Sequence, residues 1–164
     1  PHSFPARRSS GLALSGEGGP GVVSFNMTDA DVELFMRQPW VMTCTDGGLV
    51  QMGSGVPHPR NYGTYPRKLR KYVIDDDVVG LSDAVRSMTY TPATLYRVAD
   101  RGIIRVGAIA DLAVIDPATV RDTATFTDPH QLSEGMVHVL VNGQLVIDGA
   151  RFTGALPGQV LSQR

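Results

Sequence analysis

Residues 137–147 read VHVLVNGQLVI, two runs of strand-forming residues on either side of an Asn-Gly pair. An Asn-Gly pair between two such runs is the strongest short-range signal for a β-hairpin, because both central residues of the turn need positive φ. Upstream, residues 111–116 (DLAVID) predict a buried strand that Pro117 closes. The sequence after Gly102 is therefore predicted to be mainly β.

The preceding part of the chain has helical periodicity interrupted by short β-rich runs. Thr28 is a good N-cap for a helix with an acidic first turn, and Pro39 ends that helix. The β-rich runs lie at residues 22–25 (VVSF) and 41–44 (VMTC), on either side of the helix. Strands alternating with helices predict an α/β arrangement over residues 22–100.

Three further segments follow before the β part. Residues 46–66 are rich in glycine and proline and predict a long loop, of the kind that is usually functional or disordered. Residues 67–79 run from basic to acidic and predict a helix and its exit. Ser82 is the predicted cap of the next helix, whose apolar residues follow the helical period from Leu81 onward. A last helix is predicted to open at Thr91-Pro92 and to stop at Gly102.

These patterns divide the chain into three parts. Residues 1–20 contain Gly, Ser, Pro and Arg without a sustained period, and we expect a loop or disordered tail there. The change from helical to β patterning at residue 102 predicts a boundary between residues 21–101 and residues 102–164.

Composition excludes several classes of protein. The chain has 164 residues, a net charge of −1, 42% hydrophobic and 19% charged residues, which is ordinary for one globular domain. Near-neutral charge argues against nucleic-acid binding and a polybasic membrane anchor, and no apolar run is long enough to span a membrane. The single cysteine, Cys44, excludes an internal disulfide, and its apolar flanks predict a buried, unreactive thiol. A lone cysteine fits a reducing compartment, so we expect a cytoplasmic location.

Four residues are candidates for chemistry. Asp46 follows the apolar run at residues 41–44, and βα folds gather their active sites at the carboxyl ends of strands. Asp-Gly is also a common turn pair, so the residues alone favour a turn over catalysis, at about 60% to about 40%. Arg60 lies in the long loop, where a guanidinium can bind a carboxylate through two hydrogen bonds or simply be solvated. His58 lies beside Arg60, and Tyr62 could line a pocket or pack the loop.

The histidines do not form a recognisable metal motif. His2, His58, His130 and His138 include no pair spaced as His-x-His or His-Glu-x-x-His. We expect His138 to be a surface or interface residue of a strand and His130 to have a structural role in a loop. A Gly-x-Ser-x-Gly elbow is also missing from the sequence. On its own residues this chain cannot assemble a complete metal site or a catalytic triad.

Eight motifs occur in an order typical of one protein family. They are VSFNM (23–27), FMRQPWVMT (35–43), TDG (45–47), HPRNYGTYPR (58–67), RGIIRVG (101–107), ADLAVIDP (110–117), DPHQ (128–131) and HVLVNG (138–143). Over residues 20–161 they resemble the last part of the N-acyl-D-amino-acid deacylases (D-aminoacylases) of the amidohydrolase superfamily.

This resemblance implies the fold class. It implies an α/β chain that forms the C-terminal portion of a metal-dependent hydrolase (β/α)8 (TIM) barrel, plus the C-terminal strands of a small β-sandwich. Residues 21–101 would supply the last barrel strands and helices. Residues 102–164 would supply their share of the sandwich, which the family builds from both chain ends.

The resemblance also implies site residues and a cofactor. Asp46 matches the family aspartate that accepts a proton from zinc-bound water and passes it to the leaving amine, and it is a possible ligand of a second metal ion. Arg60 matches the arginine that holds the substrate's α-carboxylate, and His58 and Tyr62 are taken as substrate-binding residues beside it. The family's zinc ligands would lie upstream of this chain, and Cys44 is not the family's cysteine ligand.

The implied function is that of a zinc-dependent amidohydrolase segment. Its substrate would be a small N-acyl-D-amino acid, hydrolysed to a carboxylate and a D-amino acid. The missing N-terminal part of the same protein, or a second copy, would be its partner, and the isolated chain is expected to be inactive. Two alternatives stay open: a non-catalytic structural fragment, and a scaffold that keeps the fold without hydrolysis, as the dihydropyrimidinase-like proteins do. The presence of Asp46 and Arg60 speaks against the scaffold.

Overall fold

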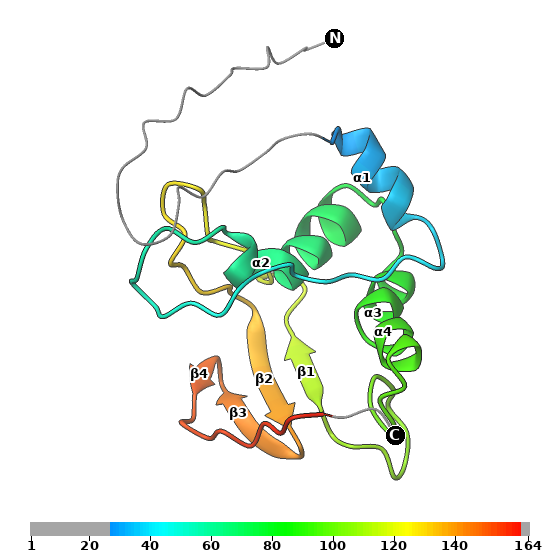
Figure 1. Cartoon of the computed structure of the whole chain (residues 1–164), viewed down its shortest axis with the longest axis vertical. Coiled ribbons are helices and arrows are strands. Elements are labelled where there is room, and N and C mark those ends of the chain that lie inside the picture. The colour runs from blue at the N-terminus through cyan, green and yellow to red at the C-terminus, as the bar shows by residue number, and fades with distance from the viewer. Residues whose placement is uncertain (1–26, 162–164) are drawn as a thin grey trace.

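Helices come first and strands last along the chain (Figure 1). The computed structural model describes residues 27–161, so the predicted tail at 1–20 and strand at 22–25 lie outside the described residues. The elements are the helices α1 (Asp29–Met36), α2 (Arg60–Arg67), the π-helix η1 (Lys68–Asp75), α3 (Leu81–Met88) and α4 (Tyr90–Leu95), followed by the strands β1 (Leu112–Ile115), β2 (Met136–Val141), β3 (Gln144–Asp148) and β4 (Arg151–Phe152).

The strands form one antiparallel sheet in the order β1-β2-β3-β4. The predicted hairpin is confirmed: β2 and β3 pair directly, and Asn142 and Gly143 in the turn have φ of 49° and 78°. The strand predicted at residues 111–116 also forms, as β1, but it is not buried as expected. Ala113 and Val114 are exposed, because none of the described elements covers them.

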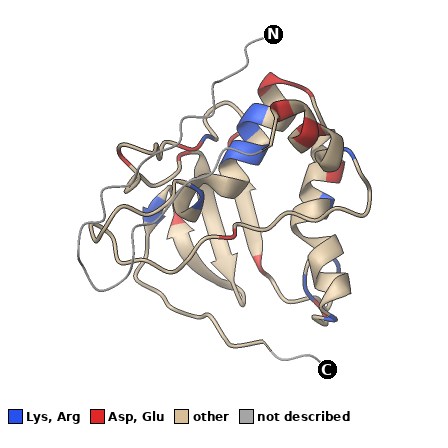
Figure 2. Cartoon of the chain, turned by 45° about the horizontal axis from the view of Figure 1, so that its top comes forward, with Lys and Arg blue, Asp and Glu red and all other residues tan. Residues whose placement is uncertain are grey.

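The first helix forms as predicted, with a reciprocal cap. The Asp31 backbone N–H donates to Thr28 Oγ1 at 3.2 Å, and the Thr28 N–H donates to Asp31 Oδ2 at 3.0 Å. The Thr28 hydroxyl also donates to Asp31 Oδ2, at 2.7 Å. This bond and the one from the Thr28 N–H lower the pKa of Asp31. The helix ends at Met36, before Pro39. Figure 2 shows acidic residues along α1 beside the basic residues of the α2–η1 helix, so opposite charges meet at this end of the molecule.

The long loop predicted at residues 46–66 is shorter than expected. Helix α2 begins at Arg60 and continues directly into η1, whereas the sequence predicted a helix only from residue 67. Pro66 lies inside the helix, where it cannot donate a hydrogen bond to the Tyr62 carbonyl. The Ser133 hydroxyl donates to that carbonyl at 2.7 Å instead. A distant side chain therefore allows the helix to pass through a proline.

Two other helix boundaries also differ from the predictions. Gly80 is the N-cap of α3, so Ser82 lies in the first turn and does not cap the helix. Helix α4 ends at Leu95, well before Gly102, because Arg97 takes a left-handed φ of 53° that a helix cannot continue through.

The strand predicted at residues 41–44 does not form. These residues are extended, but within residues 27–161 no strand pairs with them, and a strand needs a neighbour for its ladder. The Thr43 N–H donates to the Ser87 carbonyl at 2.9 Å, which links the segment to α3, and the Val41 N–H donates to the nearby Gln38 carbonyl at 3.2 Å. Cys44 is exposed, so the prediction of a buried thiol is wrong.

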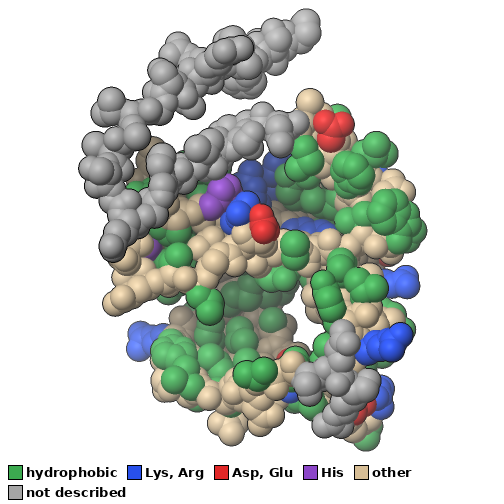
Figure 3. Space-filling model, in the orientation of Figure 1, with side chains coloured by type: hydrophobic (Ala, Val, Ile, Leu, Met, Phe, Trp, Pro, Cys, Tyr) green, Lys and Arg blue, Asp and Glu red, His purple; other side chains and the backbone are tan. Residues whose placement is uncertain are grey.

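The buried apolar core of the described residues is small. It consists of Leu69, Val78, Ala84, Val120 and Ala124. Figure 3 shows apolar side chains exposed over α1 and over α3 and α4. No helix within residues 27–161 is both long enough and apolar enough to cross a membrane.

Candidate functional site

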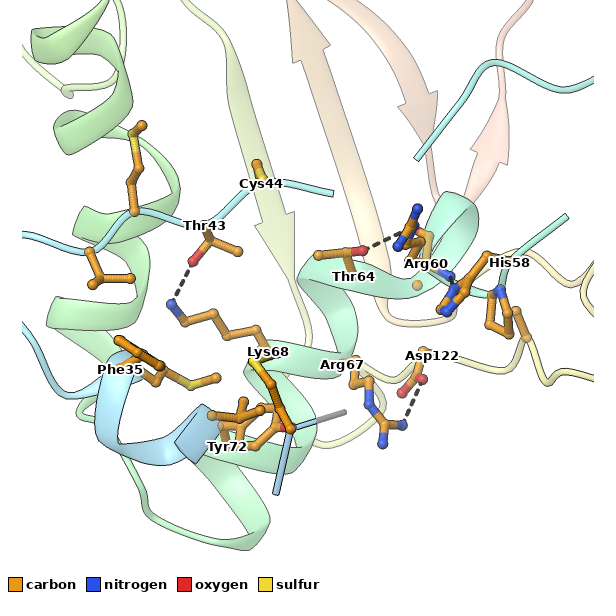
Figure 4. Close-up of a pocket in the computed structure, with 18 of the residues that line it drawn as sticks. Phe35, Thr43, Cys44, His58, Arg60, Thr64, Arg67, Lys68, Tyr72 and Asp122 are labelled. Atoms are coloured by element: carbon orange, nitrogen blue, oxygen red, sulfur yellow. Dashed lines mark hydrogen bonds and ion pairs between the residues drawn. The ribbon is translucent and has the colours of Figure 1, made fainter. Parts of the chain in front are cut away.

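A cavity of about 880 Å³ opens between α1, the extended segment at 41–44, the α2–η1 helix and residues 122–126 (Figure 4). Its walls combine apolar side chains with a row of basic ones from one helix. The basic and polar lining residues include His58, Arg60, Thr64, Arg67, Lys68 and Asp122, together with Thr43, Tyr72 and Thr125. Because the helix presents Arg60, Thr64 and Arg67 about one turn apart, these side chains point along one face of the helix.

Two of the predicted site residues form an ion pair. Arg60 Nη2 lies 3.0 Å from Asp46 Oδ2, with 43% of the arginine side chain and 79% of the aspartate side chain exposed. Arg60 lines the cavity, and Asp46 lies beside it. Both charges are accessible to a small molecule, and the guanidinium can exchange its carboxylate partner.

The backbone after Asp46 packs closely against the start of α2. Asp46 takes a φ of 45°, a left-handed conformation that aspartate tolerates better than most residues. A Cβ on Gly47 would lie 3.0 Å from Asn61 Oδ1, so a larger residue there would force Asn61 to shift by a few tenths of an ångström. Asn61 Nδ2 donates to the Gly48 carbonyl at 3.0 Å. Sequence reasoning missed Asn61, although it lies directly after Arg60 in the HPRNYG motif.

His58 lines the cavity as a mainly neutral imidazole. Its Nδ1 accepts a hydrogen bond from the Arg60 backbone N–H at 3.0 Å, and its ring meets Phe126 edge-on at 5.0 Å. Burial, and secondarily the Arg60 charge, lower the pKa of His58, against an opposing effect of Asp46.

Tyr62 lies outside the cavity wall. Its hydroxyl is 2.9 Å from His130 Nδ1, and the two rings meet edge-on at 5.8 Å. The structure thus brings Asp46, His58 and Arg60 together and directs Tyr62 to another segment. His130 is bonded to protein groups on both ring nitrogens, in agreement with the structural role predicted for it.

A buried lysine forms part of the cavity floor. Lys68 is 5% exposed, and its Nζ donates to Thr43 Oγ1 and to Ser87 Oγ, each at 2.7 Å. Burial lowers the pKa of Lys68. The sequence showed only a basic helix here, because the hydroxyls that hold this ammonium come from two distant segments.

The described residues do not complete a metal site. Within residues 27–161, no three His, Cys, Asp or Glu side chains gather closely enough to hold a metal ion. Asp46 is exposed and could supply one ligand to an ion held mainly by other groups.

The sequence matches a known protein family and several characterised relatives. Residues 15–147 match the model of the amidohydrolase family. An N-acyl-D-aspartate deacylase of Alcaligenes xylosoxydans xylosoxydans is 40% identical over 142 residues, which are 87% of this chain and 28% of the relative. A D-aminoacylase of the same organism is 39% identical over 143 residues, 87% of this chain and 29% of the relative. The chain thus spans less than a third of the length of these relatives.

Solved structures agree with the sequence relatives. The structure of a D-aminoacylase described as defining a novel subset of amidohydrolases matches with a TM-score of 0.72 and 39% identity, covering 79% of this chain and 27% of the other. An N-acyl-D-glutamate deacylase from Bordetella bronchiseptica, solved with zinc and a phosphonate mimic of the tetrahedral intermediate, matches with a TM-score of 0.68 and 38% identity. That match covers 75% of this chain and 26% of the other.

Proposed function

The chain belongs to the amidohydrolase family, and from this premise we propose that it forms the C-terminal part of a zinc-dependent hydrolase of N-acyl-D-amino acids. The observation that carries the proposal is the accessible Asp46–Arg60 pair at the cavity. Relatives named as N-acyl-D-aspartate deacylase and D-aminoacylase support the substrate class. In this proposal, residues 21–101 belong to the (β/α)8 barrel and residues 102–164 to the β-sandwich.

Arg60 binds the α-carboxylate of the substrate in this scheme. A planar guanidinium matches a carboxylate through two parallel hydrogen bonds, and an anionic substrate needs such a partner when it leaves water. In the structure Arg60 is already paired with the carboxylate of Asp46 at 3.0 Å. The substrate carboxylate takes over the guanidinium, so Asp46 is released from its ion pair as the substrate binds.

Asp46 then serves as the acid–base residue. It accepts a proton from the water whose oxygen attacks the amide carbonyl carbon, and it delivers that proton to the amide nitrogen as the C–N bond breaks. The products are a carboxylate and a D-amino acid. His58, held mainly neutral beside Arg60, adds no competing positive charge at the carboxylate-binding position.

Zinc is held mostly by groups outside the described residues in this proposal. The described residues offer no complete ligand set, and the exposed Asp46 carboxylate could supply one ligand. The remaining length of the protein, or a second copy of the chain, would supply the rest of the site and cover the apolar side chains exposed on α1 and on α3 and α4.

The test is Asp46→Asn in the full protein that contains this sequence. Loss of a positioned acid–base group lowers turnover by roughly 100- to 10,000-fold, and we expect that loss with folding and bound zinc nearly unchanged. Asp148→Asn is the matched control, because Asp148 pairs with His138 at 3.0 Å on the sheet. Unchanged hydrolysis of N-acyl-D-amino acids by Asp46→Asn would remove Asp46 from the reaction.

The 164-residue chain alone should show no deacylase activity, with or without added zinc. The reason is that its described residues leave the ligand set incomplete. Hydrolysis of an N-acyl-D-amino acid by the purified chain would contradict the proposed division of the site.

A further inference from the structure

We propose that His130 is a positioning residue that holds the Asp46–Arg60 pair in place by tying the loop after Asp46 to the helix that carries Arg60. The catalytic part of this inference rests on the proposed function, but the tie itself does not. His130 touches neither Asp46 nor Arg60 and acts on them through the segments it joins.

Three hydrogen bonds converge on the His130 ring. The Gly53 backbone N–H donates to Nδ1 at 3.2 Å, the Tyr62 hydroxyl lies 2.9 Å from the same nitrogen, and Nε2 lies 3.0 Å from the Gly55 carbonyl. Gly53 and Gly55 belong to the loop that follows Asp46, and Tyr62 lies in α2 two positions after Arg60. One imidazole therefore joins the two segments whose separation sets the distance between Asp46 and Arg60.

The bonding pattern defines the state of the ring. A backbone N–H can only donate, so Nδ1 must be the acceptor and the ring proton must reside on Nε2. Nε2 then donates to the Gly55 carbonyl, and the Tyr62 hydroxyl and the Gly53 N–H share the single lone pair of Nδ1 as a three-centre hydrogen bond. All polar positions of the neutral ring are thereby used, which fixes its orientation.

The loop has few other ties. Gly53 and Gly55 have φ of 80° and 67°, and a Cβ on either would meet nothing within 4 Å. Leu49 and Val56 are 106% and 81% exposed. Besides the packing of Gly47 on Asn61 and the bond from Asn61 to Gly48, the hydrogen bonds with His130 link this loop to the rest of the described chain.

The segment that presents His130 is itself fixed. Residues 121 and 134 close it as an isolated β-bridge, and Gln131 Nε2 donates to Asp128 Oδ2 at 2.7 Å within it. It also contacts the α2 helix directly, because Ser133 donates to the Tyr62 carbonyl and Asp122 pairs with Arg67 at 3.2 Å. His130 therefore projects from a segment that is bonded to α2 at two points toward a loop that makes few hydrogen bonds of its own.

The experiment measures loop protection and kinetics in the same variants of the full protein. In His130→Ala, amide hydrogen exchange over residues 47–57 should rise, and kcat/KM for N-acyl-D-amino acids should fall about 10- to 100-fold, the usual cost of a small misplacement. The fall should come mainly through KM, because Arg60, which binds the substrate carboxylate, is no longer held at a fixed distance from the loop that carries Asp46. His130→Asn should restore much of both, because its Oδ1 can accept hydrogen bonds near the position of Nδ1.

Two controls keep the test decisive. His138→Ala removes a histidine that contacts Asp148 and Gly149 on the sheet, and it should change neither readout. Tyr62→Phe removes only one of the three bonds and should give a smaller rise in exchange, which serves if His130→Ala fails to fold. Unchanged exchange over residues 47–57 in His130→Ala, or in Tyr62→Phe if only that variant folds, would overturn the tie. If the exchange rises but the wild-type protein hydrolyses no N-acyl-D-amino acid, the proposed function fails and the tie stands.

Discussion

The helical part and the sheet part of this chain are held together in different ways. In the sheet, each strand pairs with the next one along the sequence, so backbone hydrogen bonds between neighbours define the structure. In the helical part, the cavity and its charges depend on side chains from distant segments. Lys68 is bonded to Thr43 and Ser87, and the Tyr62 carbonyl is bonded to Ser133.

Because of this difference, we expect the sheet part and the helical part to be destabilised by different kinds of mutation. The sheet and its connections should respond mainly to changes that disturb backbone conformation. The helical part should respond mainly to the loss of single polar side chains, because each one links segments that have few other contacts. The following four predictions test that division.

The largest effect is expected for Gly135→Ala. Gly135 has a φ of 81°, and an added Cβ would clash with the backbone of Val120, a fully buried residue. Backbone strain and overpacking together should lower the free energy of unfolding by about 3 kcal/mol or more. Gly143→Ala is the control, since Gly143 has a φ of 78° but nothing within 4 Å, so only the strain of about 1–2 kcal/mol remains. Equal losses in denaturant titrations of the two variants would contradict the packing argument.

Ser87→Ala tests the helical part through the buried lysine. It removes one of the two hydroxyls that solvate the Lys68 ammonium and should cost about 1–3 kcal/mol in chemical denaturation. Lys68→Met removes the charge itself. Burial lowers the pKa of Lys68, which shows that burying the charged form is unfavourable. We expect Lys68→Met to cost less than Ser87→Ala, or to stabilise the protein. The reverse order would show that the ammonium has a stabilising partner.

Arg60→Lys tests the binding role of the guanidinium. Lysine keeps the charge but loses the planar fork, so kcat/KM of the full protein for N-acyl-D-amino acids should fall about tenfold or more, or roughly 1.4 kcal/mol. A substrate whose carboxylate is amidated should be affected little, because it lacks that interaction from the start. If both substrates lose equally, Arg60 shapes the loop and does not bind the carboxylate.

The smallest effect concerns the pH dependence of stability at His58. Its pKa in the folded state lies below the ordinary value of 6.5, so below that pH the unfolded state binds more protons at this residue. The contribution of His58 to stability is therefore complete above pH 6.5 and is lost as the pH falls through the folded pKa. His58→Asn, which keeps an acceptor for the Arg60 N–H, should flatten this part of the profile in thermal melts. His138→Asn should leave the contribution of His58 in place.

Local sequence was sufficient where the structure is made of local contacts. The Asn142-Gly143 turn and the pairing of its two strands follow from residues adjacent in sequence, and so does the cap of α1 by Thr28. Both features arise from conformational preferences of residues that are neighbours in the sequence, so the sequence alone predicts them. Asp46, His58 and Arg60 were each identified as candidates from two neighbouring motifs, TDG and HPRNYGTYPR, and the structure shows that Asp46 and Arg60 pair.

Only the tertiary structure decided the features that join distant segments. Helix α2 begins inside a predicted loop and passes through Pro66 because Ser133 supplies the missing donor. The segment at residues 41–44 has strand-forming residues but no ladder, because a strand depends on a neighbour that its own sequence does not specify. The burial of Lys68 and the convergence of Gly53, Gly55 and Tyr62 on His130 likewise depend on chain segments that meet only after folding.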